Sequence, residues 1–238
     1  MTKGTTCKVQ LRPLGLGPQD YNSIRTAAEI VSLAFASDPL IRWISRDRTG
    51  PGWESLPPTL QLWQEARLRG YAVRAIAMEA VTVDKSQPVG SCFLFPPSPK
   101  SRWLNPLWWP AYLRVLWDEW WVQPNETLGD EKRIDLMMQS HEEFKDKMKK
   151  RYPPNSLYYL EIAAVKPDTQ GMGVGKAIME WVVSEVGNSP CFLECTDKKN
   201  VGFYEKFGFR LVEEGKLVQE GDEAFSTTFY YMARDKTE

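Results

Sequence analysis

The segment Tyr158-Tyr-Leu-Glu-Ile-Ala-Ala-Val165 runs directly into Lys166-Pro-Asp-Thr-Gln-Gly-Met-Gly-Val-Gly-Lys-Ala177. Its first part predicts an apolar strand, and its second part predicts a glycine-rich turn followed by the first turn of a helix. The N–H groups at a helix start have no partner inside the helix, and the helix dipole adds partial positive charge there. The segment therefore predicts a phosphate-binding site built from main-chain N–H groups.

The composition is that of a globular protein with a sizeable core. The chain has 238 residues, of which 42% are hydrophobic and 26% are charged, and its net charge is −1. This charge offers no basic field for nucleic acid. One histidine and four cysteines without paired spacing argue against a Cys/His metal site, so we expect no metal.

The sequence lacks the features of a membrane span or a secretion signal. No stretch approaches the ~20 apolar residues that a span needs, and Met1 to Gln10 contains no apolar run. With its cysteines unpaired, we expect a reduced, cytoplasmic protein.

Hydrophobic periodicity predicts helices around one mixed sheet. The predicted elements are a strand at 7–11, helices at 20–35, 39–44 and 59–70, strands at 75–83 and 88–95, two helices within 96–156, a strand at 158–165, a helix at 173–187, a strand at 191–195, a helix at 200–207, and strands at 209–218 and 225–233. This order is typical of a mixed α/β (α+β) protein. We interpret residues 1–238 as a single domain with a tryptophan-rich helical insertion at about 96–156.

Two common phosphate motifs do not fit the glycine turn. The nucleotide P-loop needs a glycine where the chain has Gln170 and a serine or threonine where it has Ala177. The dinucleotide fingerprint Gly-x-Gly-x-x-Gly also fails, because the glycines are at 171, 173 and 175.

A third pattern fits. Gln170, Gly173 and Gly175 match Arg/Gln-x-x-Gly-x-Gly/Ala, and Asn200-Val-Gly-Phe-Tyr-Glu-Lys-Phe-Gly-Phe209 follows about 30 residues later. Together they resemble the two hallmarks of the Gcn5-related N-acetyltransferases (GNAT), which bind acetyl-coenzyme A. The resemblance is strong over 157–233 and weaker over 8–95, where Ala34-Phe-Ala-Ser-Asp-Pro39 is similar to a phrase of the small-molecule branches from fungi and bacteria. It implies a mostly antiparallel, splayed central sheet flanked by helices.

The resemblance also implies which residues bind acetyl-CoA. The pyrophosphate is expected on the N–H groups of residues 171–176, and the pantetheine arm beside residues 163–165. Lys176 would add a charge or remain a solvated lysine, and Asn200 would contact the cofactor, cap its helix, or both. The implied cofactor-binding residues are Ala163, Ala164, Val165, Gln170, Gly171, Met172, Gly173, Val174, Gly175, Lys176, Asn200 and Tyr204.

Acetyl transfer to an amine requires removal of a proton, because a free alkylamine has a pKa near ~10.4. Glu161, the one charge in an apolar strand, is the candidate base; the alternative is a structural glutamate held by a buried arginine or tyrosine. Glu194 is the reserve base, and His141 is a further candidate or else a core residue. By resemblance, Tyr204 is the general acid that protonates the departing thiolate, or it only hydrogen-bonds the cofactor.

Six of the ten tryptophans cluster in the insertion. The helix after Pro110 has one broad apolar face, which we interpret as an aromatic core packed on the sheet. Part of that face could also line the pocket for the acceptor; Asp118 and Glu119 argue against a membrane-surface helix. The face comprises Leu113, Leu116, Trp117, Trp120 and Trp121.

These observations predict an acetyl-CoA-dependent N-acetyltransferase. The acceptor is expected to be the primary amine of a small, apolar or aromatic molecule, which attacks directly within a ternary complex. A protein or peptide N-acetyltransferase and a non-catalytic CoA-binding sensor are the alternatives.

Overall fold

The computed structural model describes residues 8–15, 21–46, 54, 56–97, 108–122, 129–153 and 155–235. Cys7, where the sequence predicts the start of the first strand, lies outside these residues, as does Trp103.

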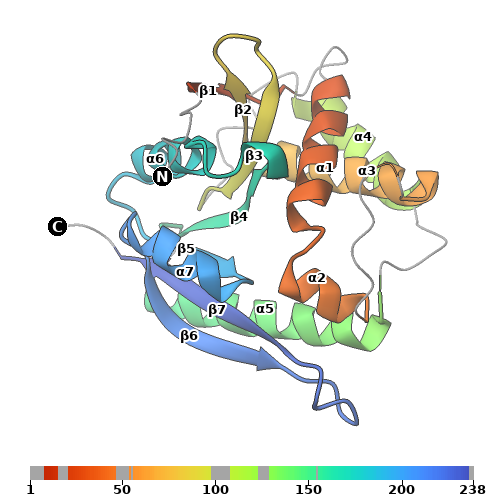
Figure 1. Cartoon of the computed structure of the whole chain (residues 1–238), viewed down its shortest axis with the longest axis vertical. Helices are drawn as coiled ribbons and strands as arrows, with labels where there is room; N and C mark the ends of the chain where they lie inside the picture. The colour runs from red at the N-terminus through yellow and green to blue at the C-terminus, as the bar shows by residue number, and fades with distance from the viewer. Residues whose placement is uncertain are drawn as a thin grey trace.

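The described chain forms one seven-stranded sheet with the order β1-β2-β3-β4-β5-β7-β6 (Figure 1). All neighbouring strands are antiparallel except β4 and β5, which are parallel. This confirms the predicted mixed, mostly antiparallel sheet. The strands are β1 (Val9–Pro13), β2 (Ile76–Thr82), β3 (Pro88–Phe95), β4 (Tyr158–Val165), β5 (Cys191–Cys195), β6 (Arg210–Leu217) and β7 (Thr227–Arg234).

Helices cover both faces of the sheet. The helices are α1 (Tyr21–Phe35), α2 (Pro39–Ile44), α3 (Pro58–Arg74), α4 (Trp108–Trp121), α5 (Glu131–Arg151), α6 (Val174–Val186) and α7 (Val201–Glu205), with 3-10 turns at Pro167–Thr169 and Lys198–Asn200. Helix α6 packs on one face of β1 to β4, and α1 and α3 pack on the opposite face (Figure 1). Helices α2 and α5 pack against β7 and β6, at the other half of the sheet.

Strands β4 and β5 part halfway along their length. Their pairing ends at Leu160 and Leu193, although β4 continues to Val165 and β5 continues to Cys195. On its other side β4 remains paired with β3 as far as Val165. Beyond Leu160, one edge of β4 therefore has no neighbouring strand within the described chain.

A β-bulge lies where the strands part. Phe93 of β3 pairs with Ile162 and Leu94 pairs with Leu160, so Glu161 has no partner on β3. Residues two apart in a regular strand share a face. Here Leu160 packs beneath α6, whereas Ile162 packs beneath α1 and α3. The bulge therefore reverses which face the rest of β4 presents.

The predicted apolar face of α4 points outward, and the expectation of an aromatic core on the sheet is wrong. Trp117, Trp120 and Trp121 are 59%, 82% and 70% exposed. The buried side of α4 carries small residues against α3, where Val115 comes close to Gly70. A glycine lets two helices approach closely, so this contact favours small side chains over indoles. The exposed large apolar residues of α4 are Trp109, Leu113, Leu116, Trp117, Trp120 and Trp121.

A buried acid strengthens the contact between α4 and α3. Asp118 is 2% exposed and pairs with Arg69 of α3 and Arg114 of α4. Hydrophobic periodicity therefore cannot tell which side of α4 is buried. The exposed side is rich in tryptophan, and the buried side combines small apolar residues with this acid.

Helix α5 buries only part of its apolar side. Phe144 and Met148 are buried, but Met138 is 48% exposed. The helix begins after Asp130, whose side chain accepts hydrogen bonds from the N–H groups of Lys132 and Arg133 and caps the helix.

Arg133 of α5 is fully buried. Its guanidinium donates to the carbonyl of Trp43 (2.5 Å), to Gln219 (2.7 Å) and to Asp222. It also lies over the rings of Trp43 and Phe225, 5.2 and 5.1 Å from their centroids. Arg133 thereby joins α2, α5 and the loop between β6 and β7.

We expect Arg133→Ala to lower the free energy of unfolding by about 3 kcal/mol, because it leaves buried hydrogen-bond acceptors without their donor. Urea denaturation measures the change. The matched control is Lys132→Ala, an exposed neighbour on the same helix, which should change stability by less than about 0.5 kcal/mol. Equal effects of the two substitutions would contradict the structural role of Arg133.

Candidate active site

The bulge at Glu161 directs polar side chains toward α3. The hydroxyl of Tyr71, on α3, donates to the Glu161 carboxylate at 3.0 Å. Burial and the charge of Glu161 raise the pKa of Tyr71 to about 12. Glu161 thus has the tyrosine partner expected if it were a structural glutamate. It is also half-buried and lies beside the unpaired edge of β4.

Tyr159 connects Glu161 with a second carboxylate. Its hydroxyl donates to Glu194 of β5 at 3.4 Å, and it is near enough to Glu161 for the charge of that carboxylate to act on the phenol. Burial, followed by the charges of Glu161 and Glu194, raises the pKa of Tyr159 well above its usual value, so the phenol keeps its proton. The ring is stacked between Phe192 and Phe95, with centroids 4.4 and 6.2 Å away.

His141 of α5 binds Glu194 directly. Its Nδ1 lies 2.8 and 3.0 Å from the two oxygens of Glu194. Burial alone would lower the pKa of His141, but the hydrogen bond to Glu194 and the charges of Glu194 and Glu161 outweigh it and raise the pKa above 6.5. The side chain is 15% exposed, so His141 is a polar residue at the edge of the cluster and not the core residue of the alternative interpretation.

The structure thus brings all three predicted base candidates together. Glu161, Glu194 and His141 come from β4, β5 and α5, and Tyr159 lies among them. Tyr71 and Tyr159 complete this acid–tyrosine cluster, and neither was predicted as a site residue. The position of Tyr159, two residues before Glu161, could have indicated that the two side chains are close. Nothing in the sequence indicates that Tyr71 lies near Glu161.

Tyr204, on α7, lies away from this cluster and packs, half-buried, against the core beneath α6. Burial, with smaller contributions from Cys195, Cys92 and Asp38, raises the pKa of Tyr204. Its phenol is therefore neutral at physiological pH and retains a proton that it can donate.

Asp38 is a half-buried carboxylate just before α2 that was not predicted as a site residue. It caps α2 by accepting from the N–H groups of Leu40 and Ile41 at 2.9 and 3.4 Å. It also accepts a hydrogen bond from the hydroxyl of Thr196, just after β5. Burial raises the pKa of Asp38, which is close enough to Tyr204 to influence the pKa of that phenol.

The glycine turn has the geometry that its sequence demands. Gly171 and Gly173 have φ angles of 77° and 93°, in the left-handed region that favours glycine. Gly173 is the N-cap of α6 and makes no side-chain capping bond. Gln170 donates to the carbonyl of Val165 at 3.3 Å and so ties the turn to the end of β4.

Three other residues predicted to bind the cofactor differ in how their side chains are placed near the glycine turn. The side chain of Val174 is buried in the core, which leaves only its backbone for a ligand. Lys176 is 68% exposed, with its Nζ 3.5 Å from Glu180. Asn200 makes no capping hydrogen bond, because Asp197 caps the preceding 3-10 turn by accepting from Lys199; the capping role predicted for Asn200 is wrong.

The free edge of β4 suits an extended chain. Ala163, Ala164 and Val165 pair with β3 on one side, while on the other side β5 has already diverged. Unpaired backbone groups on a strand edge readily bind another extended segment.

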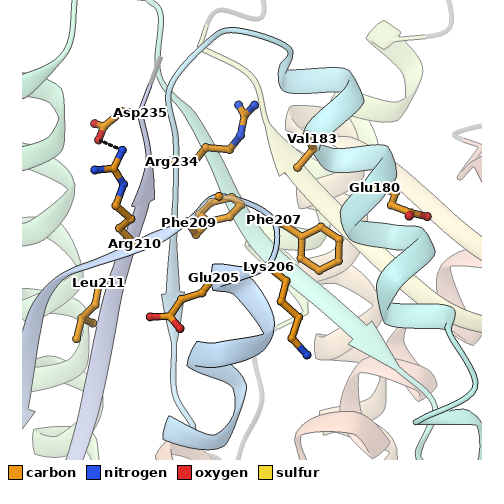
Figure 2. Close-up of a pocket in the computed structure, with 11 residues that line it drawn as sticks. Glu180, Val183, Glu205, Lys206, Phe207, Phe209, Arg210, Leu211, Arg234 and Asp235 are labelled. Atoms are coloured by element: carbon orange, nitrogen blue, oxygen red, sulfur yellow. Dashed lines mark ion pairs between the residues drawn. The ribbon is translucent and has the colours of Figure 1, made fainter. Parts of the chain in front are cut away.

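An open groove of about 970 Å³ lies elsewhere, between α6, the segment after α7 and the end of β7 (Figure 2). None of the predicted site residues is among its lining residues in the described chain. Its basic side chains Lys206, Arg210 and Arg234 are matched in number by acidic ones, and Arg210 pairs with Asp235 at 3.9 Å (Figure 2). The groove therefore offers no excess positive charge to a nucleotide phosphate.

Within the described residues, no group of three or more histidine, cysteine, aspartate or glutamate side chains is placed to hold a metal ion. None of the helices in this part of the chain has the length and apolar character of a membrane span.

Comparison with known proteins finds similarity to acetyltransferases in both sequence and structure. The sequence model of the acetyltransferase (GNAT) domain matches residues 141–211, from α5 to the start of β6. Among crystal structures, histone acetyltransferase HPA2 and related acetyltransferase from Corynebacterium glutamicum is similar with a TM-score of 0.58 at 18% identity, over 97% of each chain.

Two further structures share the fold. Arylalkylamine N-acetyltransferase 2 from Aedes aegypti has a TM-score of 0.61 at 14% identity, over 96% of this chain and 99% of that chain. The C-terminal condensation domain of Ebony, in complex with beta-alanyl-dopamine, has a TM-score of 0.62 at 12% identity, over 96% and 99%. Residues 141–211 thus match an acetyltransferase (GNAT) domain, and the chain shares the fold of these acetyltransferase structures.

The His141–Glu194 pair predicts a pH-dependent contribution to stability. Because the pKa of His141 is raised on folding, the pair stabilises fully below pH 6.5 and loses this effect as the pH rises through the raised pKa. We expect the difference in unfolding free energy between wild type and His141→Gln to shrink from about pH 6 to about pH 9. Urea titrations across this range measure it; a constant difference would contradict the assignment.

Proposed function

We propose that the protein is an acetyl-CoA-dependent N-acetyltransferase that acts on the primary amine of a small molecule, by direct attack within a ternary complex. The observation that carries this proposal is the parting of β4 from β5. One end of β4 leads into the glycine turn, and its bulged middle holds Glu161 near Glu194 and His141.

The turn and the strand edge fit acetyl-CoA. The N–H groups of residues 171–176 would hold the pyrophosphate at the start of α6, where Gly173 has no side chain to obstruct it. The edge at residues 163–165 would hold the pantetheine arm, with Gln170, Asn200 and Tyr204 as further contacts. Acetyl-CoA supplies the acyl group as a thioester. A backbone N–H of this edge would stabilise negative charge on the carbonyl oxygen.

The acid–tyrosine cluster fits a protonated amine. Glu161 would attract the ammonium and accept its proton, so that the neutral nitrogen can attack. The rings of Tyr71, Tyr159 and Phe95 lie against one another beside it, with Tyr71 5.5 Å from Phe95. Aromatic faces attract cations and pack against apolar groups, which favours an alkylamine with an apolar or aromatic body.

Tyr204 would give its proton to the departing thiolate. Its raised pKa keeps the phenol protonated at physiological pH, so it still has a proton when the thiolate departs. The proton that the attacking nitrogen loses as the amide forms would then restore the phenol. Glu161 and Tyr204 thus have opposite roles, and their surroundings differ accordingly: both are half-buried, but Glu161 lies beside tyrosine hydroxyls, whereas Tyr204 packs against apolar side chains.

We expect acetyl-CoA at about 100 times its Kd to raise the free energy of unfolding by ~2.7 kcal/mol, because it binds only the folded state. Gly175→Leu should remove this stabilisation, since even a Cβ at this position reaches 3.4 Å from Phe203, in the space between α6 and α7. Ser184→Leu, exposed near the other end of α6, should retain it. A thermal shift assay measures both; no effect of acetyl-CoA on the wild type would overturn the proposed cofactor.

We expect Glu161→Gln and Tyr204→Phe each to lower kcat/KM for the amine by about 100-fold or more, because each removes a proton-transferring group. An amine library screened by release of CoA provides the substrate. Glu185→Gln, exposed on α6, is the matched control and should leave turnover unchanged. Wild-type rates in both variants would show that the assigned roles are wrong.

A further inference from the structure

The base candidates and Tyr159 form a row of groups that can pass protons to one another. The Tyr159 hydroxyl lies 3.4 Å from Glu194 on one side, and on the other side Tyr159 is near enough to Glu161 for this carboxylate to raise the pKa of the phenol. Glu194 in turn holds Nδ1 of His141 at 2.8 Å. Each contact joins a different pair of side chains, so the chain extends from the bulge of β4, through β5, to helix α5.

This chain of groups ends at the protein surface. Nε2 of His141, the nitrogen that Glu194 does not hold, lies 3.8 Å from Glu142, whose side chain is 53% exposed. The inner end is different: Glu161 is half-buried and also receives a hydrogen bond from Tyr71. The hydrogen-bonded groups therefore lead from the proposed acceptor site toward solvent.

An enzyme that removes a proton from an ammonium must dispose of it in every turnover. Glu161 can accept the proton, but it serves again only after losing it. Because the edge of β4 beyond Glu161 is assigned to the pantetheine arm, the bound cosubstrate would cover that route. The chain through Tyr159 leads the other way.

We propose that Tyr159, Glu194 and His141 form a relay that carries the acceptor's proton from Glu161 to solvent; this inference rests on the proposed N-acetyltransferase function. It also assigns a role to the helical insertion, because His141 lies on α5. Tyr159, Glu194 and His141 act through Glu161, so they are positioning and relay residues.

The transfer balances in protons. The ammonium gives one proton to the Glu161 carboxylate, which becomes a carboxylic acid. That acid gives its proton to the Tyr159 oxygen as the Tyr159 hydroxyl passes its own to Glu194. Glu194 then protonates Nδ1 of neutral His141, and His141 releases the proton on Nε2 to water. A half-turn of the imidazole ring then presents its unprotonated nitrogen to Glu194 again, so that each cycle releases one proton. The second proton that the nitrogen loses as the amide forms replaces the one that Tyr204 gives to the thiolate.

Relay through His141 makes turnover depend on its protonation. Glu194 and Glu161 from the sheet and Glu142 from α5 favour its charged form, whereas Lys145 of α5 opposes it. The neutral phenol of Tyr159 also faces the ring, 5.5 Å between centroids. Since the relay needs neutral His141 to accept a proton, kcat/KM should fall at acidic pH with the raised pKa of His141.

The test measures kcat/KM for the amine against pH in Tyr159→Phe, Glu194→Gln and His141→Gln, each of which breaks one link. We expect each to lower kcat/KM at pH 8 by about 10- to 100-fold and His141→Gln to abolish the acid limb. The double variant Glu194→Gln/His141→Gln should be no slower than either single variant, because the links act as a unit. Added imidazole should restore part of the rate of His141→Ala.

The control is Glu143→Gln, which removes a glutamate bound to Gln139 on the exposed side of α5 and should keep the wild-type profile. A thermal shift with acetyl-CoA checks that each variant is folded and binds the cosubstrate. Wild-type rates and an unchanged acid limb in Tyr159→Phe and His141→Gln would overturn the relay alone. No turnover of any amine by the wild type would overturn the proposed function, and the relay with it.

Discussion

A strand that loses its neighbour halfway along must leave backbone groups unpaired or offer them to another molecule. Strand β4 is under this constraint after Leu160, where β5 diverges. The remaining strand edge, the glycine turn after it and the start of α6 lie in direct succession along the chain. Because β4 and β5 diverge, Glu161 and Glu194 are not neighbours through backbone pairing. Instead, the Tyr159 side chain lies near both carboxylates.

The acid–tyrosine cluster is costly unless its charges are compensated. Two carboxylates in a half-buried site repel each other and lose hydration. The structure compensates in two ways: tyrosine hydroxyls donate to them, and the charged form of His141 is favoured. A bound ammonium would add a further compensating charge. The arrangement therefore favours a cationic ligand before any chemistry takes place.

Much of this fold could be predicted from sequence because its signals are local. The strand–glycine–helix succession at 158–177, the second hallmark at 200–209 and the order of strands follow from periodicity and turn residues. The outward face of α4 could not be predicted in this way. It depends on the contact of Val115 with Gly70, which are far apart in the chain. The bulge was equally hidden, since it arises from a shift of register between β3 and β4.

The candidate site shows the same division. The sequence predicted Glu161, Glu194 and His141 separately, from residue type and position. That they meet depends on how α5 lies across the sheet, and Tyr71 enters from a helix nearly a hundred residues earlier. Arg133 gave no signal in the sequence, because its burial depends on residues near 43 and 220 that are far from it in the chain.

Arg133 bears on how this chain can be altered by evolution or by design. An insertion between two strands of a common fold is often regarded as a module that can be deleted. Here the inserted helix donates a buried cation to a carbonyl near residue 43 and to side chains near residue 220. Removing the insertion would expose acceptors in both terminal parts of the chain. The inserted helix is therefore needed for the stability of the rest of the fold. A shorter version of this protein cannot be made simply by deleting the insertion.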